Sequence, residues 1–288
     1  MKSTKLGRIE NYDKVLPVLE IYRCVQSEGS RAGYPTICVR TTGCTHRCWF
    51  NEGGWCDSFY TSIEPEKGKY CFNDIVKMYE DNPHIKEMML TGGSPSMHGD
   101  LVNELTHFAK ENGIFITMET EGSHYLETDY PINLLSISPK FSNSIPKLGI
   151  KMPTSDKVVG EKFIKQHNKF RLHYDNIAKS IMYHSDYHIK PVLDKDLSIV
   201  NELEFFIVEL SKKLAFYSTS VEFSDEEMFE LEGDFKDKIE SKVWCMPVGD
   251  DIPALLESYG PVMDFVRDRG FKFTGRPHII GFGTRREV

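Results

Sequence analysis

Three cysteines within thirteen residues constrain this chain more than any other feature of its sequence. Cys44, Cys48 and Cys56 are three of its seven cysteines, and the other four are scattered. Thiolates are soft ligands that select zinc, copper(I) or iron–sulfur clusters. A structural zinc site is closed by four protein ligands, whereas three thiolates on a four-iron cluster leave one iron open. The spacing therefore leaves three interpretations: an iron–sulfur cluster, a zinc site completed by His46, or a loop of unligated cysteines.

The composition argues against several classes of protein. The chain has 288 residues, of which 40% are hydrophobic and 27% charged, and its net charge is −8. These values are typical of globular proteins, and the acidic balance argues against a general nucleic-acid binder. No apolar run is long enough to span a membrane, and the N-terminus lacks the apolar core of a signal peptide. Seven unevenly placed cysteines favour metal ligands or free thiols over disulfides. We therefore expect a cytoplasmic protein that binds neither membrane nor nucleic acid.

Strand and helix patterns alternate along the chain. Strands are predicted over residues 18–23, 36–41, 85–90, 114–118, 133–137, 184–192 and 242–246. Helices are predicted over residues 73–81, 101–112, 199–210 and 262–269, with Gly113 and Gly270 as stop signals for the second and the last. Such alternation predicts an α/β fold in which crossover helices join parallel strands.

The polar and glycine-rich loops follow the predicted strands directly. The cysteine loop, Thr91–Pro95, Glu119–Ser123 and Ser138–Lys140 each come after one strand. In parallel α/β folds the site lies at the carboxyl ends of the strands. We therefore expect these four loops to meet at one mouth.

No repeat, low-complexity segment or clear linker divides the sequence, so we expect one domain over residues 1–288. Residues 1–17 form a polar arm in this interpretation. Residues 141–182 and 224–240 are expected to be insertions. The first of these is rich in lysine, which is also typical of a solvated helix face, and the second is strongly acidic.

Taken together, these segments resemble the radical S-adenosylmethionine (SAM) enzymes and, within that class, the 7-carboxy-7-deazaguanine synthase family. The resemblance covers about residues 18–140 well and about 242–283 thinly. Beyond the cysteine loop and the Thr91–Pro95 loop, it rests on Glu20-Ile-Tyr22, Gln26-Ser-Glu-Gly29, Gly33-Tyr-Pro35, Arg40, Cys56-Asp-Ser58, Glu119-Thr120, Ser138-Pro-Lys140 and Arg276-Pro-His278. It implies a partial (β/α) TIM-like barrel of the radical SAM type, open on one side, with an insertion in its second half.

The sequence departs from the family pattern at two places. Seven residues separate Cys48 from Cys56, where the family usually has two. Residues 50–54 are interpreted as an insertion whose glycines let the loop bulge while the thiolates still meet. Ser94 stands where many radical SAM proteins have glutamate, a position at which this family varies.

The resemblance implies three cofactors: a [4Fe–4S] cluster, SAM and Mg²⁺. Cys44, Cys48 and Cys56 would hold a [4Fe–4S] cluster, whose open iron is chelated by the amino and carboxylate groups of SAM. An electron from the cluster then cleaves SAM to a 5′-deoxyadenosyl radical. Gly92 and Gly93 carry no side chain, so the backbone can approach SAM closely. The full set expected to bind SAM is Trp55, Cys56, Asp57, Gly92, Gly93, Glu119, Ser138, Pro139, Lys140, Met246 and Pro247.

The resemblance also implies the reaction. The family converts 6-carboxy-5,6,7,8-tetrahydropterin into 7-carboxy-7-deazaguanine by hydrogen abstraction at C6, ring contraction and loss of ammonia, in queuosine and other 7-deazapurine biosynthesis. Arg40 would hold the substrate carboxylate in a two-pronged geometry, unless it is paired with a nearby acid. The set expected to bind substrate is Val25, Gln26, Ser27, Glu28, Arg40 and Thr91. Ser58 would bind Mg²⁺ through its hydroxyl, with Asp57 as a second oxygen candidate.

Two other functions stay open at this point. A non-enzymatic zinc module would close its site with His46 or Cys71 and would be indifferent to SAM. A radical SAM activase that forms a glycyl radical on a partner protein would need a docking surface in place of a small-molecule pocket. Family membership further implies a flavodoxin-like or other electron donor and allows a homodimer. His278 resembles a late histidine of the family, and the sequence gives it no role.

Overall fold

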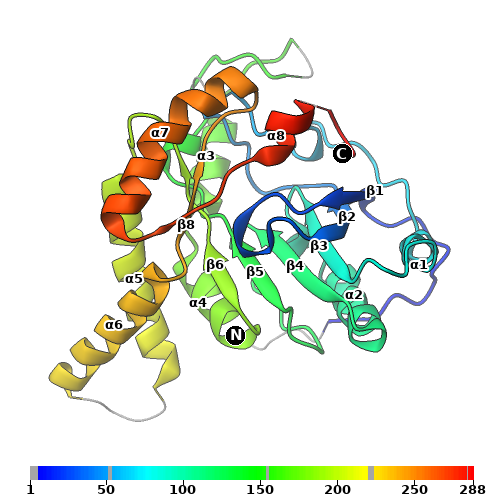
Figure 1. Cartoon of the computed structure of the whole chain (residues 1–288), viewed down its shortest axis with the longest axis horizontal. Coiled ribbons are helices and arrows are strands. Elements are labelled where there is room, and N and C mark those ends of the chain that lie inside the picture. Colours follow the sequence, from blue (N-terminus) through cyan, green and yellow to red (C-terminus); the bar gives the residue numbers. More distant parts are fainter. Residues whose placement is uncertain (1–5, 51–53, 154–155, 220–223, 284) are drawn as a thin grey trace.

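The computed structural model describes residues 6–50, 54–153, 156–219, 224–283 and 285–288. Its centre is a six-stranded sheet in the order β1-β2-β3-β4-β5-β6 (Figure 1). A second, three-stranded sheet has the order β7-β8-β9. The strands are β1 Val18–Val25, β2 Pro35–Thr41, β3 Glu87–Gly92, β4 Phe115–Thr120, β5 Leu134–Ile137, β6 Tyr187–Ile189, β7 Val192–Leu193, β8 Trp244–Pro247 and β9 Lys272–Phe273. The fold is therefore mixed α/β, with a mainly parallel sheet.

The direction of β1 differs from the parallel arrangement that the alternation predicted. β1 pairs with β2 antiparallel, whereas each following pair from β2 to β6 is parallel. No crossover helix separates β1 from β2, and parallel neighbours need such a connection. The short loop between them, over residues 26–34, instead turns the chain back on itself. This loop consequently lies at the end of the sheet where the parallel strands begin: Val25 pairs with Pro35 at the start of β2, and Arg31 of the loop bonds Glu87 at the start of β3.

The single strand predicted over residues 184–192 is two strands in two sheets. β6 ends at Ile189 and β7 begins at Val192, with Lys190 and Pro191 between them. Proline has no N–H to donate to a sheet ladder, so it interrupts a strand. The two sheets still touch, because Ile189 forms a parallel bridge with Val243 just before β8. Lys190 follows the last residue of β6, and its amide still donates to the Ile137 carbonyl of β5 at 2.6 Å.

The helices lie along the outside of the strands (Figure 1). Their bounds are α1 Phe72–Glu80, α2 Gly99–Asn112, α3 Glu161–Phe170, α4 Tyr174–Tyr183, α5 Val200–Ser218, α6 Asp225–Glu240, α7 Ile252–Arg269 and α8 Pro277–Phe282. Short 3₁₀ turns cover η1 Gly29–Arg31, η3 Phe59–Thr61, η4 Pro95–Met97 and η5 Ser142–Ser144. The predicted stop signals are confirmed, since Gly113 and Gly270 end α2 and α7 in the left-handed conformation with φ of 63° and 71°.

The two segments expected as insertions are largely helical. Residues 141–182 contain α3 and most of α4, and α3 exposes half of its ten residues, as expected for a helix with one solvated face. Residues 224–240 form α6, which Ser224 and Glu227 begin with a reciprocal capping box. α6 packs along α5 at one end of the molecule (Figure 1).

Apolar side chains between the sheet and its helices hold the strands in place. Leu101 and Leu105 of α2 are buried, as are Met88 and Leu90 of β3. Burial of each such side chain contributes roughly 1.5–3 kcal/mol. This core fixes the strand ends and therefore the loops that follow them. No helix in the described part of the chain is both long and apolar enough to cross a membrane.

Candidate functional site

A cavity of about 810 Å³ lies at the carboxyl ends of the parallel strands. Its wall includes the ends of β3 and β4, the turns after β5 and β6, and residues of β8. The cysteine loop and the loop between β1 and β2 complete it. The expectation that the polar loops meet at one mouth is therefore confirmed. After β9, Thr274 Oγ1 accepts a hydrogen bond of 2.7 Å from the Gly29 amide in the loop between β1 and β2.

The cavity brings together nearly all of the residues that the sequence singled out. The lining residues from that set are Val25, Gln26, Ser27, Glu28, Arg40, Cys44, Cys48, Trp55, Cys56, Asp57, Ser58, Thr91, Gly92, Gly93, Glu119, Ser138, Lys140 and Met246. Pro139 and Pro247 are buried and are not among the lining residues in the described part of the chain. They lie next in sequence to lining residues and fix the backbone there.

A small hairpin compensates for the long spacing between the second and third cysteines. Trp49 and Trp55 form an antiparallel bridge. The Phe50 amide donates to the Gly54 carbonyl at 2.8 Å, and the Cys56 amide donates to the Cys48 carbonyl at 3.1 Å. The two cysteines are thus neighbours across the hairpin. Residues 51–53 of the predicted insertion lie outside the described residues.

The three thiols are free and face the same cavity. Burial raises the pKa of Cys44 to about 12 and that of Cys56 to about 11, and the pKa of Cys48 is also raised well above its usual value. Buried thiols of this kind ionise when a strong positive charge, such as a metal, lies beside them. The three thiols line one cavity but are not drawn together around a single point in this structure. Their number and type still match the donor set of a four-iron cluster, in which each thiolate bonds a different iron.

The residues proposed to complete a zinc site have other surroundings. His46 bonds Thr45 through Nδ1 at 2.8 Å and packs edge-on against His167 at a centroid distance of 5.0 Å. Cys71 lies at the N-cap of α1, where its amide donates to Asp74 at 2.7 Å. Among the described residues, no three His, Cys, Asp or Glu side chains are grouped so that they could hold a metal ion.

Gly92 and Gly93 allow two parts of the cavity wall to touch. Gly92 has a φ of +128°, and a Cβ there would lie 2.2 Å from the Thr41 carbonyl oxygen. A Cβ on Gly93 would lie 2.1 Å from the Gly43 carbonyl oxygen. Real Cβ atoms do not come so close to another atom, so these positions require glycine. The end of β3 therefore rests directly on the start of the cysteine loop.

Arg40 is fixed on the cavity wall by three side chains. Its Nε donates to Glu20 at 2.7 Å, and its two terminal nitrogens donate to Ser58 at 3.0 Å and Tyr22 at 2.8 Å. Glu20 is 1% exposed, so the alternative of an arginine paired with a nearby acid is present in this structure. Guanidinium has five N–H donors, and these contacts use three of them.

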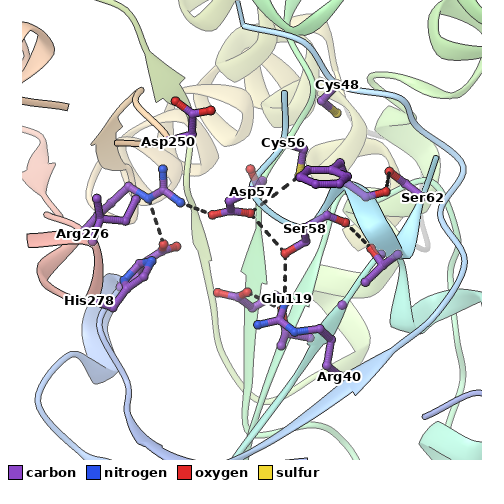
Figure 2. A pocket seen from close by; sticks show the side chains of 18 of the residues that line it. Arg40, Cys48, Cys56, Asp57, Ser58, Ser62, Glu119, Asp250, Arg276 and His278 are labelled. Carbon is purple, nitrogen blue, oxygen red and sulfur yellow. Dashed lines mark hydrogen bonds and ion pairs between the residues drawn. The ribbon is translucent and has the colours of Figure 1, made fainter. Parts of the chain in front are cut away.

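A chain of polar contacts links Arg40 to the C-terminal segment (Figure 2). Ser58 donates to Asp57 at 3.1 Å, and the other oxygen of Asp57 accepts from Arg276. Burial opposes ionisation of Asp57, but the Arg276 guanidinium holds the pKa of this carboxyl below its usual value. The hydroxyl proposed for Mg²⁺ therefore lies between a guanidinium and an ionised carboxylate.

Lys190 is a site residue that the sequence reasoning missed. Its side chain is 4% exposed and lies between Glu28 and Glu119, with the Glu119 contact at 2.9 Å. Burial alone lowers the pKa of this lysine, but the two carboxylates outweigh that effect and raise it above its usual value. Glu119 also accepts from Thr91 Oγ1 at 2.7 Å. A lysine just before a proline, inside the strand predicted over residues 184–192, was the signal available in the sequence.

The loop between β1 and β2 supplies the opposite wall. Gln26 is buried, and its side-chain oxygen accepts from the Ser27 amide at 3.0 Å. Ser27 Oγ lies 2.7 Å from Nδ1 of His278, the histidine that had no role from sequence and that also lines the cavity. Val25 is 57% exposed, so it lies at the rim.

Comparison with known proteins identifies the family. A 7-carboxy-7-deazaguanine synthase of Halobacterium salinarum is 30% identical over 264 residues, which cover 92% of this chain and 89% of that protein. The chain belongs to the 7-carboxy-7-deazaguanine synthase family. A synthase of the same name from Rhodopirellula baltica is 26% identical over 271 residues and covers 94% of this chain and 88% of the relative. A scan against models of protein families finds no match.

A solved structure agrees with this family at the level of the fold. The crystal structure of QueE from Escherichia coli superposes with a TM-score of 0.51, at 16% sequence identity, over 91% of this chain and 93% of that one. Members of the 7-carboxy-7-deazaguanine synthase family are radical SAM lyases. The chain is accordingly an enzyme of this class, and the class uses a [4Fe–4S] cluster and SAM.

Proposed function

We propose that this protein converts 6-carboxy-5,6,7,8-tetrahydropterin into 7-carboxy-7-deazaguanine with loss of ammonia. The observation that carries the proposal is the single cavity that holds three free cysteines on one wall and Arg40, Gln26 and Glu28 on another. The first wall suits a cluster with an open iron, and the second suits a small carboxylated heterocycle. A reacting pair held in one such cavity gains rate from proximity and orientation.

Cys44, Cys48 and Cys56 are proposed to hold the [4Fe–4S] cluster. When bound, the cluster and SAM together supply a 5′-deoxyadenosyl radical that abstracts hydrogen from the substrate. The residues proposed to position SAM are Trp55, Cys56, Asp57, Gly92, Gly93, Glu119, Ser138, Pro139, Lys140, Met246 and Pro247. Within this group, Lys140 donates to Ser138 Oγ at 2.8 Å, and the Ser138 amide donates to the Thr120 carbonyl at 2.7 Å. These contacts hold the turn after β5 in one conformation.

The substrate is proposed to lie against Val25, Gln26, Ser27, Glu28, Arg40 and Thr91. The fixed guanidinium of Arg40 keeps N–H donors for the substrate carboxylate, and Glu20 and Tyr22 prevent it from swinging away. Lys190 keeps Glu28 ionised, because the pKa of that carboxyl lies below its usual value beside Lys190 and Arg276 despite its burial. An ionised Glu28 accepts hydrogen bonds, so it suits the N–H groups of a pterin edge.

A magnesium site at Ser58 completes the proposal. Mg²⁺ binds oxygen ligands, retains several waters and needs few protein ligands. Ser58 Oγ and Asp57 are the oxygens at this place, and the substrate carboxylate held by Arg40 would supply another. Omission of Mg²⁺ from the assay is expected to lower turnover, and Ser58→Ala is expected to remove that dependence.

We further propose that the whole chain works as one radical SAM domain built as a partial (β/α) barrel. The parallel order from β2 to β6 and the bridge from β6 towards β8 support this arrangement. Residues 141–182 and 224–240 are proposed to be insertions into it. Free thiols and an oxygen-sensitive cluster suit the reducing cytoplasm. A flavodoxin-like or other electron donor is proposed to reduce the cluster. A homodimer is consistent with the family.

Anaerobic reconstitution with iron and sulfide tests the cofactor. We expect about four irons per chain and an EPR signal of the reduced cluster that changes when SAM is added. Cys56→Ala is expected to lose both. Iron that fails to bind, or a spectrum indifferent to SAM, would remove the basis of the proposal.

The reconstituted enzyme is then incubated with the carboxypterin, SAM, Mg²⁺ and a chemical reductant, and the products are separated by liquid chromatography. Release of 7-carboxy-7-deazaguanine and ammonia without any partner protein supports the proposal. Cleavage of SAM with no conversion of the pterin would instead favour the glycyl-radical activase.

A further inference from the structure

The carboxylate of Glu121 lies buried on the cavity wall with one oxygen satisfied and the other free. Glu121 is 5% exposed and lines the cavity. Its Oε1 accepts from Thr45 at 3.0 Å, from Ser94 at 2.8 Å and from Ser123. Its Oε2 is completely buried and has no hydrogen-bond partner among the described residues. Hydrogen bonds to Oε1 thus hold the carboxylate in place, while Oε2 receives none from the described residues.

An unsatisfied buried carboxylate oxygen is costly to a folded protein. Buried polar groups are nearly always hydrogen-bonded, and each exception calls for an explanation such as a missing ligand. The cost is largest when the group is charged. Three hydroxyl donors on Oε1 stabilise the carboxylate but do not supply a cation or a donor to Oε2. A donor from a bound molecule would complete the site.

Glu121 lies in the part of the cavity wall that we assign to the cluster and SAM. Thr45, which bonds Glu121, directly follows Cys44. Gly93, which precedes Ser94, packs so closely on the cysteine loop that a Cβ there would lie 2.9 Å from the Cβ of Cys44. Glu121 therefore lies beside the first cluster cysteine, at the end of β4.

The serine at position 94 explains why the carboxylate at this part of the wall comes from Glu121. Many radical SAM proteins have glutamate where this chain has Ser94. In this structure the Ser94 side chain is fully buried and donates to Glu121. The small serine leaves room for the Glu121 carboxylate to approach from the neighbouring strand end. A carboxyl group is kept at this point of the wall, although it is attached to a different residue.

We propose that Oε2 of Glu121 accepts a hydrogen bond from the amino group of bound SAM and so replaces the glutamate absent at position 94. The inference rests on the proposed function, in which SAM chelates the open iron. An amine that binds a metal through its lone pair keeps two N–H donors. The sulfonium of SAM has no N–H to offer. The adenine amine and the ribose hydroxyls are donors too, but the amino group is the donor that would be held at the cluster, next to the cysteine loop that Glu121 contacts.

Ligand affinities of the cluster-loaded protein test this assignment. Equilibrium dialysis under anaerobic conditions measures the Kd of SAM, S-adenosylhomocysteine and 5′-methylthioadenosine for wild type and for Glu121→Gln. The first two ligands carry the amino acid, only SAM is a sulfonium, and the third lacks the amino acid. We expect Glu121→Gln to weaken SAM and S-adenosylhomocysteine by similar factors, about tenfold or more, and to leave methylthioadenosine unchanged.

Other patterns of affinity overturn the proposal. Equal SAM affinity in wild type and Glu121→Gln would show that Oε2 meets no part of SAM. A loss of affinity confined to SAM would mean that Glu121 interacts with the sulfonium charge and not with the amino group. A loss that includes methylthioadenosine, or a loss of iron, would indicate a structural role. Glu104→Gln is the control, because it removes a buried carboxylate from α2 outside the cavity and should leave all three affinities unchanged.

A second variant moves the carboxylate back to the loop after β3. Ser94→Glu combined with Glu121→Ser should recover most of the lost SAM affinity at normal iron content. No recovery at normal iron content would contradict the idea that a carboxylate is needed at this point. Failure of the proposed function is distinct, because wild type itself would then bind no SAM or would leave the carboxypterin unchanged.

Discussion

The buried ammonium of Lys190 lies 2.9 Å from the carboxylate of Glu119, so an ion pair joins the ends of β6 and β4 across the cavity wall. Glu28 contacts the same ammonium from the loop after β1. Three distant parts of the chain are therefore held at the cavity by one cation. Removal of that cation would leave two carboxylates close together in a buried place.

Lys190→Met is expected to destabilise the protein at neutral pH. Breaking a buried ion pair on one side costs about 3 kcal/mol or more, because the remaining charges stay buried without compensation. The loss should shrink as the pH is lowered: burial opposes ionisation of Glu28, but Lys190 holds the pKa of this carboxyl below its usual value, so the contribution of the pair disappears as Glu28 is protonated. Urea unfolding at several pH values measures it. Lys242→Met is the matched control, as its contact with Asp186 is partly exposed and should cost less than about 1 kcal/mol. Equal losses in the two variants would contradict the prediction.

Arg40→Lys is expected to raise the KM for the carboxypterin by about tenfold to a hundredfold while the Kd of SAM stays unchanged. Lysine keeps the positive charge but cannot match a carboxylate with two parallel N–H groups. Steady-state kinetics and equilibrium dialysis separate the two quantities. Arg23→Lys on β1 serves as the control, because Arg23 bonds Asn82 outside the cavity. An unchanged KM would place the substrate carboxylate elsewhere.

Deletion of residues 50–54 is expected to preserve the cluster. It would join Trp49 to Trp55, which already pair with each other, and would leave two residues between Cys48 and Cys56, the usual spacing of the family. Iron content after reconstitution and the EPR spectrum measure the outcome. Loss of iron from a folded deletion variant would mean that the inserted segment positions the thiols itself.

Stability is expected to fall in acid partly through Glu104. Burial opposes the ionisation of this carboxyl, yet donors from Arg8, Tyr12 and the Ile9 amide hold its pKa at about 2, below its usual 4.5. A lowered folded-state pKa contributes stability above pH 4.5, and this contribution is lost as the pH falls towards 2.

Glu104→Gln should therefore lower the free energy of unfolding by about 2 kcal/mol at pH 7, and its difference from wild type should disappear towards pH 2. Denaturant titrations at pH 7, 4 and 3 follow this convergence. Glu111→Gln, on the exposed face of the same helix, should show no such pH-dependent difference. Parallel pH profiles for wild type and Glu104→Gln would refute the assignment.

Periodicity and stop signals predicted the central elements of the fold. β2 to β5, α1 and α2 lie where the sequence places them, because each buries a regular apolar pattern and ends at a recognisable signal such as Gly113. The antiparallel direction of β1 was missed, although the signal was local: the connection over residues 26–34 is too short to hold the crossover helix that parallel neighbours need. The division of residues 184–192 depends on Pro191, whose missing N–H outweighs the apolar run.

The cavity wall was predicted better than the contacts within it. Residues in the cysteine loop and at strand ends were found because such places gather ligands in parallel folds. Lys190 was missed because its role depends on Glu28 and Glu119, which are remote in sequence. Glu121 was visible beside Glu119, but only its burial and its free oxygen distinguish it from an ordinary loop residue.

Arg276 bonds Asp57 and Glu28, which precede it by 219 and 248 residues. Contacts of such sequence separation are slow to form, since the loss of chain entropy on closing a long loop comes before any gain from the contact. We therefore expect the charged side of the cavity to assemble late in folding, after β2 to β5 have paired. A growing polypeptide would consequently expose the thiols of Cys44, Cys48 and Cys56 to solvent before the wall that covers them has formed. Whether metal binds before or after that wall forms would then decide how long the thiols stay exposed.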